Sequence, residues 1–469
     1  MTEEEAKAAP AATKTADMTG MPGYKFAMTV TVLDCLGCGS CVNICPGKKG
    51  EKALTMAGLD SQRDQQEVYD YGQKLPAKEE VLAKFKADSV KGSQFRQPML
   101  EFSGACAGCG ETPYAKLITQ LFGERMYIAN ATGCSSIWGN PAATSPYTVN
   151  KDSKKGPAWS NSLFEDAAEF GYGMLLAQKA IREGLKAKVE AVAANEKASE
   201  EVKAACQEWL DTYTVGATNG AATDKLVAAL EGIDCDVCKD IVKNKDFLAK
   251  KSQWIFGGDG WAYDIGFGGV DHVLASGKDI NIMVFDTEVY SNTGGQSSKS
   301  TPTGAIAQFA AGGKETKKKD LAGIAMSYGY VYVAHISMGA DMNQCVKALA
   351  EAEAYPGPSL IIAYAPCINH GIKKGMSKAQ TEEKLAVESG YWVNFRYNPT
   401  LAAEGKDAFS LDSKEPTGDY QAFLKGENRY ASLAKFNPER AAELFAKAEK
   451  NSKDEYDHLK KLVTLYAGK

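Results

Sequence analysis

Four cysteines near the start of the chain are spaced to bind an iron–sulfur cluster. Cys35, Cys38, Cys41 and Cys45 follow the pattern C-x2-C-x2-C-x3-C, and Pro46 follows the last of them. Thiolates are soft ligands, and the short glycine-containing segments between the cysteines allow the sulfurs to converge on a [4Fe–4S] cluster. Since the chain shows no sign of secretion, we expect cluster ligands here rather than a disulfide network.

The same run is typical of bacterial two-cluster ferredoxins, in which the fourth cysteine binds the other cluster. A second run would complete such a domain, and the 469-residue sequence contains none. We therefore expect the companion run to come from another polypeptide or from a preceding part of a larger protein. Alternating apolar residues at 26–32 predict a strand that enters the run.

A second group of cysteines is scattered through the chain. Cys106 and Cys109 form a C-x2-C pair, whereas Cys134 and Cys367 stand alone in polar or glycine-flanked segments. Four thiols of this kind can bind a [4Fe–4S] cluster or Zn²⁺. Spacing alone leaves both open, together with buried cysteines that bind nothing.

The other cysteines are interpreted as structural. Cys235 and Cys238 form a further C-x2-C pair in a segment of helical character, with a secondary metal or redox role as the alternative. Cys206 and Cys345 lie within amphipathic segments, where we expect them to be packing residues.

Two further segments carry the residue types of a diphosphate and magnesium site. In the first, a strand expected at 253–256 leads into Gly258-Asp259-Gly260-Trp261 and then into a helix expected from about Ala262. Glycines let backbone amides approach a phosphate, a helix N-terminus adds partial positive charge, and an aspartate beside it can bind Mg²⁺.

The second segment, Asp286-Thr287-Glu288-Val289-Tyr290-Ser291-Asn292, directly follows a strand expected at 280–285. Because parallel strands present their carboxyl ends at one edge of a sheet, we expect Asp259 and Thr287 to lie close together. The two segments resemble the thiamine diphosphate-binding motif. That motif has an asparagine near the position of Thr287, whereas Asn292 comes five residues later.

Positioning these residues requires a parallel α/β sheet. Apolar segments at 253–256, 280–285 and 360–364 are separated by helical stretches, which predicts parallel strands joined by crossover helices. Helical patterns at 165–210 and 438–465 predict further helices. The fold class is therefore α/β, a parallel sheet with flanking helices preceded by a partial ferredoxin-like segment.

Composition narrows the classes of function. The chain has 54 Lys and Arg against 59 Asp and Glu, a net charge of −5, which gives no support for nucleic-acid binding. No stretch approaches the roughly 18 consecutive apolar residues of a membrane span. Twelve cysteines and a polar start without an apolar leader lead us to expect a reducing, cytoplasmic location.

A specific family matches these features together. The segments at 258–269 and 286–295 and the scattered cysteines resemble pyruvate:ferredoxin (flavodoxin) oxidoreductase, and the resemblance covers the chain almost end to end. It divides the chain into a flexible lead-in (1–22), a partial ferredoxin-like [4Fe–4S] segment (23–60), a connecting arm (61–98), a thiamine diphosphate-binding domain with a cysteine-ligated [4Fe–4S] cluster (99–390) and a C-terminal helical extension (391–469).

The resemblance also implies site residues. Asp259, Thr287 and the main-chain carbonyl of Val289 would bind Mg²⁺, and Cys106, Cys109, Cys134 and Cys367 would bind the cluster nearest the cofactor. Thiamine diphosphate contacts would come from Glu111, Cys134, Gly258, Asp259, Gly260, Trp261, Thr287, Glu288, Val289, Tyr290, Ser291 and Asn292. Glu111 and Asn292 are the catalytic candidates. The glutamate that activates the cofactor's aminopyrimidine in this family has no counterpart that we can assign.

The implied activity is oxidative decarboxylation of pyruvate with coenzyme A to acetyl-CoA and CO2, a step of anaerobic pyruvate metabolism. Electrons would pass through [4Fe–4S] clusters to ferredoxin or flavodoxin. The partners would be the missing N-terminal domains or subunit, in a homodimer of the full assembly. Two alternatives stay open: the same chemistry on another 2-oxoacid, such as 2-oxoglutarate or an aryl pyruvate, and a non-enzymatic electron-transfer module.

Overall fold

Three hydrophobic segments form the centre of the main sheet. The computed structural model describes residues 1–47, 51–139 and 144–468. In it β5 (Ser252–Gly258), β6 (Ile280–Asp286) and β8 (Pro358–Tyr364) are neighbouring parallel strands, which confirms the sequence prediction. Nearly all of their residues are buried, because helices cover both faces of the sheet, and this explains the continuous apolar runs in the sequence.

Shorter strands extend the sheet on both sides. Its order is β10-β9-β7-β8-β6-β5-β3-β4, with β3 (Met126–Asn130), β4 (Ala158–Asn161) and β7 (Tyr332–Ile336) parallel to the central strands. β9 (Phe395–Tyr397) and β10 (Phe409–Leu411) add an antiparallel edge. The region after residue 391, expected to be helical, thus also contributes two strands to this sheet.

Nineteen α-helices account for nearly half of the other described residues. They are α1 (Glu3–Lys7), α2 (Ser40–Ile44), α3 (Gln65–Lys74), α4 (Glu79–Lys84), α5 (Val90–Ser93), α6 (Thr112–Phe122), α7 (Cys134–Gly139), α8 (Ala167–Ala193), α9 (Glu200–Asp211), α10 (Gly216–Leu230), α11 (Asp236–Lys243), α12 (Phe267–Ala275), α13 (Leu321–Met326), α14 (Met342–Ala354), α15 (Ala379–Glu388), α16 (Thr400–Ala403), α17 (Tyr420–Lys425), α18 (Asn428–Phe436) and α19 (Pro438–Leu465). The last agrees with the helix predicted at 438–465.

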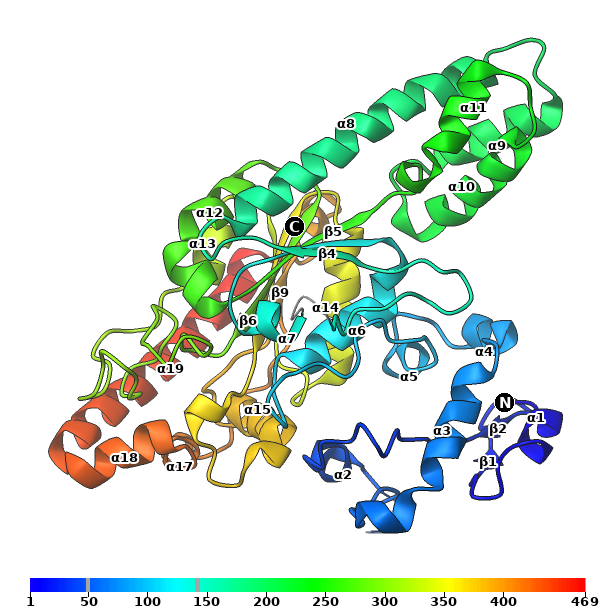
Figure 1. Cartoon of the computed structure of the whole chain (residues 1–469). Helices are drawn as coiled ribbons and strands as arrows, with labels where there is room; N and C mark the ends of the chain where they lie inside the picture. Colours follow the sequence, from blue (N-terminus) through cyan, green and yellow to red (C-terminus); the bar gives the residue numbers. More distant parts are fainter. Residues whose placement is uncertain (48–50, 140–143, 469) are drawn as a thin grey trace.

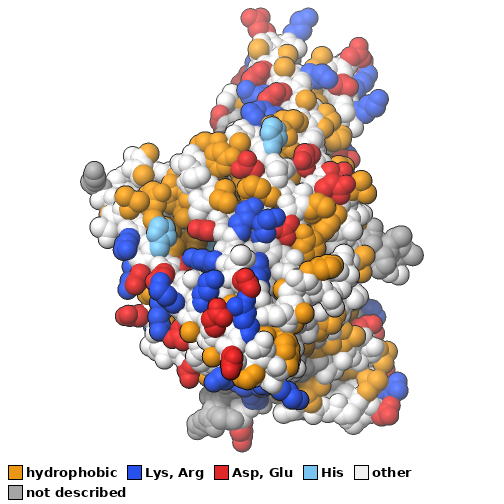
Figure 2. All heavy atoms as spheres, turned by 90° about the vertical axis from the view of Figure 1, so that its left-hand side faces the viewer, with side chains coloured by type: hydrophobic (Ala, Val, Ile, Leu, Met, Phe, Trp, Pro, Cys, Tyr) orange, Lys and Arg blue, Asp and Glu red, His pale blue; other side chains and the backbone are white. Residues whose placement is uncertain are grey.

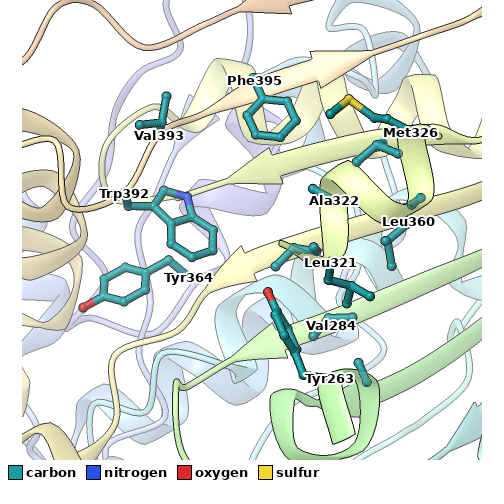
Figure 3. Close-up of a cluster of buried hydrophobic side chains, with 14 of the residues drawn as sticks. Tyr263, Val284, Leu321, Ala322, Met326, Leu360, Tyr364, Trp392, Val393 and Phe395 are labelled. Atoms are coloured by element: carbon teal, nitrogen blue, oxygen red, sulfur yellow. The ribbon is translucent and has the colours of Figure 1, made fainter. Parts of the chain in front are cut away.

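Alternate side chains of the central strands enter two different cores. Val284 of β6 packs with residues of α12, α13 and α19, and Figure 3 shows part of this core, including Leu360 and Trp392. The next residue, Phe285, belongs to the opposite core with α6 and α14. This period-two pattern places helices on both faces of the sheet (Figure 1).

A helical arm extends from the sheet. The first part of α8 lies against β3 and β5, and its remainder packs with α9, α10 and α11 (Figure 1). The arm has its own core, which includes Trp209, Leu226 and Ile241. Cys206 and Cys238 are buried in this core, and Cys345 is buried under the sheet, in agreement with the packing roles expected for Cys206 and Cys345.

The N-terminal segment contains little regular sheet. Among its described residues, β1 (Ala16–Asp17) pairs with β2 (Lys25–Phe26) and Thr2 makes an isolated bridge to Tyr24, so the strand predicted at 26–32 is wrong beyond its first residue. Met28 and Val30 are exposed and lack the packed face that a stable strand needs. The segment instead contacts the main domain through α2, where Asn43 Nδ2 donates to the carbonyl of Ser377 at 3.0 Å.

Two surface properties complete the description. No described helix is both long and apolar enough to cross a bilayer. On the face shown in Figure 2, Lys and Arg side chains gather near the middle with Asp and Glu side chains among them. Charges of both signs are therefore mixed on this face.

Candidate functional site

Predicted site residues from four strands reach one edge of the sheet. Cys134 follows β3, Asp259 follows β5, Thr287 follows β6, and Cys367 comes three residues after β8. These strands are adjacent and parallel, so their carboxyl ends coincide. Open α/β sheets bind ligands at this edge.

Three oxygens expected to bind Mg²⁺ lie together there. Thr287 Oγ1 is 3.0 Å from Asp259 Oδ1 and 3.0 Å from the carbonyl oxygen of Val289. The Thr287 N–H also donates to Asp259 Oδ1 at 3.2 Å, and the Ser298 hydroxyl donates to Oδ2 at 2.6 Å. A carboxylate, a hydroxyl and a carbonyl are hard donors of the kind that Mg²⁺ prefers.

The charge of Asp259 supports the same interpretation. Its side chain is buried, and burial raises the pKa of its carboxyl well above the ordinary value, with the nearby Asp286 adding to the effect. The nearby Lys318 charge acts to lower this pKa, but its ammonium forms ion pairs with Asp286 and Glu288. Among the described residues no Lys, Arg or His forms an ion pair with Asp259, and a divalent ion would favour its ionised form.

The Gly-Asp-Gly turn leaves room for a ligand on one side and packs tightly on the other. A Cβ on Gly258 would have only the carbonyl oxygen of Phe285 nearby, at 3.8 Å, so this backbone is open to approach. A Cβ on Gly260 would lie 2.5 Å from the ring of Tyr290, which explains the glycine. Trp261 is fully buried and supports the turn from inside.

The helix expected from about Ala262 begins differently. Residues Gly260–Ile265 form a π-helical turn (η4), and regular α-helix follows only as α12. A helix thus does follow the turn, starting two residues before the expected position and with a π-helical first part. Wide π turns of this kind recur at functional sites, where they reposition side chains.

Ser291 connects the diphosphate segment to two of the predicted cluster ligands. Its hydroxyl lies 3.1 Å from Cys134 Sγ, and its carbonyl accepts a hydrogen bond from Asn369 Nδ2 at 3.3 Å. The same amide group lies 3.6 Å from Cys367 Sγ. The two cysteines therefore flank one short stretch of the loop that carries Thr287.

The Cys106–Cys109 loop approaches the same place. The Gly110 N–H donates to the carbonyl of Pro366, the residue before Cys367, at 3.0 Å. Burial raises the pKa of Cys134 to about 12, and Glu111, Cys367 and Cys106 add negative charge nearby. Burial likewise raises the pKa of Cys367 to about 11, so a cation would be needed to hold these thiols ionised.

The thiols do not converge on a single ion. Among the described residues, no three His, Cys, Asp or Glu side chains are close enough to bind one metal ion. A [4Fe–4S] cube is larger than an ion and is held by thiolates from several sides. The donor set of Cys106, Cys109, Cys134 and Cys367 is all sulfur, with Cys106 exposed and the other three half-buried, and it fits a cluster by its chemistry.

The two catalytic candidates lie in different environments. Glu111 is buried, accepts a hydrogen bond from Trp138 Nε1 at 2.6 Å, and has its pKa raised by burial to about 7. Asn292 is exposed in the turn after Ser291. Glu111 is thus a preformed part of the buried site, whereas Asn292 faces outward.

The N-terminal cysteines lie beside the main domain. Cys35 and Cys41 are exposed, Cys38 and Cys45 are half-buried, and backbone N–H groups around Cys45 lower its pKa. Met376–Lys378 (η6) lies between the two cysteine groups. It contacts α2 through Asn43, and a Cβ on Gly108 would lie 2.4 Å from the Met376 carbonyl oxygen.

Sequence reasoning did not identify several residues around the diphosphate segment. Ser298, Lys318, Tyr391 and Arg429 contact Asp259 or Glu288. The signal in the sequence was weak: a serine-rich stretch and a lysine run, both ordinary in surface loops. A recess of about 560 Å³ opens beside Tyr290, and it is lined by Lys299, Lys314, Lys317 and Lys319. These lysines bring positive charge close to the segment.

Comparisons with known proteins agree with the resemblance seen in the sequence. Residues 242–363 match the family model for the C-terminal TPP-binding domain of thiamine pyrophosphate enzymes. The chain is 55% identical to pyruvate:ferredoxin oxidoreductase of Moorella thermoacetica, with 97% of this chain and 40% of the relative covered. It is 54% identical to the pyruvate-flavodoxin oxidoreductases of Enterobacter agglomerans (99% and 40% covered) and Klebsiella pneumoniae (98% and 39% covered).

These values define what the similarity covers. Nearly all of this chain aligns with the relatives, so the expected likeness to one part of these oxidoreductases is confirmed. The chain spans about two fifths of the length of the curated relatives that it matches.

Proposed function

We propose that this chain, the counterpart of one part of a pyruvate:ferredoxin or pyruvate:flavodoxin oxidoreductase, provides that enzyme's diphosphate and Mg²⁺ half-site and part of its electron path. The whole enzyme converts pyruvate and coenzyme A to acetyl-CoA and CO2 and passes electrons to ferredoxin or flavodoxin. The names of the similar proteins support this reaction. The proposal includes [4Fe–4S] clusters at both cysteine groups and a cytoplasmic location.

One observation carries the proposal. The loop after β6 places the Thr287 hydroxyl against both Asp259 and the Val289 carbonyl, and four residues after Thr287 it presents Ser291 to Cys134. A cofactor anchored at the first position would therefore lie beside a cluster at the second. Bound thiamine diphosphate would act as the electron sink that stabilises the carbanion formed when pyruvate loses CO2.

The chain's own residues have separate tasks in this scheme. Asp259 and Thr287 hold the cation that neutralises the diphosphate, and the lysines beside Tyr290 add positive charge. The Glu111 N–H donates to Cys109 Sγ at 3.4 Å. Glu111 is therefore a buried acid–base group beside the Cys106–Cys109 loop. The segment at 376–378 joins the two cysteine groups into one path.

The remaining partners follow from the reaction. The aminopyrimidine of the cofactor needs a glutamate that we assign to another part of the enzyme, and coenzyme A and ferredoxin or flavodoxin are the further partners. We propose a homodimer of the complete assembly.

Calorimetric titration of the full chain with thiamine diphosphate tests the half-site. In the presence of Mg²⁺ we expect binding, and Asp259→Ala should weaken it by about 100-fold or more because a cation ligand is lost. Ser298→Ala removes a hydrogen bond to that ligand and should cost about 10-fold.

The matched control is Asp271→Ala. Asp271 lies on α12 and accepts a hydrogen bond from the Tyr328 hydroxyl at 2.7 Å, away from the diphosphate loop. Its loss should leave the affinity within about twofold. Equal affinities for the wild type and Asp259→Ala would show that the Gly-Asp-Gly turn is only structural.

A further inference from the structure

Glu288 occupies a strained position between two residues of the candidate cation site. Its φ is +60°, which makes it one of four non-glycine residues with positive φ among those that the structure describes. This left-handed conformation is unfavourable for a residue with a Cβ. Glu288 is also only 2% exposed, so its carboxylate has lost its water. Other contacts must offset both costs.

Those contacts come from three distant parts of the chain. Lys318 Nζ lies 3.0 Å from Glu288 Oε1, and it is 30 residues away in sequence. The Tyr391 hydroxyl donates to Oε2 at 2.5 Å over a separation of 103 residues. Arg429 donates to the same oxygen at 2.9 Å over a separation of 141 residues. Both oxygens of the Glu288 carboxylate are therefore bound by side chains of the protein itself.

The three groups are themselves fixed. Arg429 Nε lies 2.6 Å from Glu427 Oε2, and its terminal nitrogen also donates to the Tyr391 hydroxyl at 3.0 Å. Lys318 pairs with Asp286 at 2.8 Å. Burial opposes ionisation of Glu288, but the Lys318 and Arg429 charges outweigh it and hold its pKa at about 2.

The backbone of Glu288 is held as well. Its N–H donates to Asp286 Oδ1 at 3.1 Å, and its carbonyl accepts the Thr301 hydroxyl at 2.6 Å. All its polar groups thus bind within the protein. With the side chain of Glu288 turned inward, the Thr287 hydroxyl on one side of it meets both Asp259 Oδ1 and the carbonyl of Val289 on the other side.

We propose that Lys318, Tyr391 and Arg429 are positioning residues for cofactor binding. They hold the Glu288 carboxylate, and this holds the left-handed turn that presents Thr287 Oγ1 and the Val289 carbonyl to Mg²⁺. The inference rests on the proposed function, because it gives these residues a task only if the cation site exists. Glu288 then supports the site through its conformation instead of touching thiamine diphosphate.

A buried ion cluster that merely stabilises the fold is the competing explanation. Arg396 on β9 provides a control for this explanation, because it forms ion pairs with Glu351 at 2.7 Å and with Asp412 at 2.8 Å. Arg396→Met and Arg429→Met each break a largely buried arginine–carboxylate cluster. Of these two clusters, only the one around Arg429 contacts the diphosphate loop.

Two measurements on the full chain separate these explanations: the Mg²⁺-dependent affinity for thiamine diphosphate, and amide hydrogen exchange of residues 286–296. Arg429→Met should weaken binding by about 10–100-fold, as for other residues that orient cation ligands. Tyr391→Phe, which leaves no charge unpaired, should weaken it a few-fold. Arg429→Lys should recover part of the loss. In the ligand-free variants at positions 429 and 391, exchange in 286–296 should be faster, and in Arg396→Met it should match the wild type.

Each failure has its own meaning. Wild-type affinity and wild-type exchange in Arg429→Met and Tyr391→Phe would overturn the positioning role. Equal losses in Arg396→Met would show a general stability effect and would overturn it as well. If the wild-type chain itself does not bind thiamine diphosphate, the proposed function fails, while hydrogen exchange still decides whether the contacts order the loop.

Discussion

Buried carboxyl groups near the sheet edge differ in charge because their partners differ. Glu288 faces two cations, Lys318 and Arg429, and has a pKa of about 2. Glu383 forms no ion pair within the described part of the chain, and it accepts hydrogen bonds from the Gly339 N–H at 2.7 Å and the Tyr114 hydroxyl at 3.1 Å. Burial raises its pKa to about 8. Position in the fold therefore sets which carboxyl groups are charged at neutral pH.

Glu383 should make the stability of the fold depend on pH. Its pKa rises from an ordinary 4.5 to about 8 on folding, so between these values the folded protein holds a proton that the unfolded chain has released. Raising the pH through this window should lower the free energy of unfolding. Glutamine at position 383 cannot titrate. Over the same rise in pH, the unfolding free energy of Glu383→Gln should therefore fall by about 2–4 kcal/mol less than that of the wild type, at about 1.4 kcal/mol per pKa unit.

Urea unfolding from about pH 5 to about pH 8 under anaerobic conditions measures this difference. Glu388→Gln is the control, because Glu388 is an exposed carboxyl on the same helix. The same pH slope in all three proteins would contradict the assignment.

The connecting loops between elements assemble the candidate site. Cys134 begins α7 directly after the loop that follows β3, Cys367 lies in the loop after β8, and the loop before α6 carries Cys106 and Cys109. None of these segments alone contains a complete set of ligands. Their coincidence follows from the parallel order of the strands.

Replacing Cys134 by serine should remove one cluster. We expect Cys134→Ser to lose about four iron atoms per chain, because a [4Fe–4S] cluster without one thiolate is not retained. Cys206→Ser, which changes a buried thiol in the helical arm, should keep the full iron content. Iron and zinc analysis of the anaerobically purified proteins checks this. Full iron in Cys134→Ser, or zinc in place of iron, would refute the cluster at this position.

The sequence predicts the elements that local pattern determines. The strands β5, β6 and β8 are long apolar runs, and α19 has a continuous helical pattern with Pro438 at its first turn. The edge strands β9 and β10, with three residues each, are too short for such a signal. Their pairing depends on neighbours that only the tertiary fold brings together.

The same limit applies within the site. Asp259 and Thr287 could be placed together because each follows a recognisable strand. Arg429 could not be connected to Glu288, since the contact spans 141 residues and depends on where α18 packs. The π turn at Gly260–Ile265 also has no marker in the sequence apart from its glycines.

At the scale of the whole molecule, this chain contains one half of the proposed chemistry. It holds residues suited to the diphosphate and to two clusters, and it spans about two fifths of the length of its relatives. The group that activates the aminopyrimidine, and a second ferredoxin-like cysteine run, have no assigned counterpart here. We therefore expect catalysis to require the region of the enzyme that the relatives have in addition.

Pyruvate-dependent reduction of methyl viologen tests the central claim most directly. The chain would be reconstituted anaerobically with iron, sulfide, thiamine diphosphate, Mg²⁺ and coenzyme A, and assayed alone and with the remaining region of the enzyme. We predict no reduction by the chain alone, reduction when the remaining region is added, and loss of that activity in Asp259→Ala. Pyruvate oxidation by the chain alone, or full activity of Asp259→Ala in the combined assay, would contradict the account.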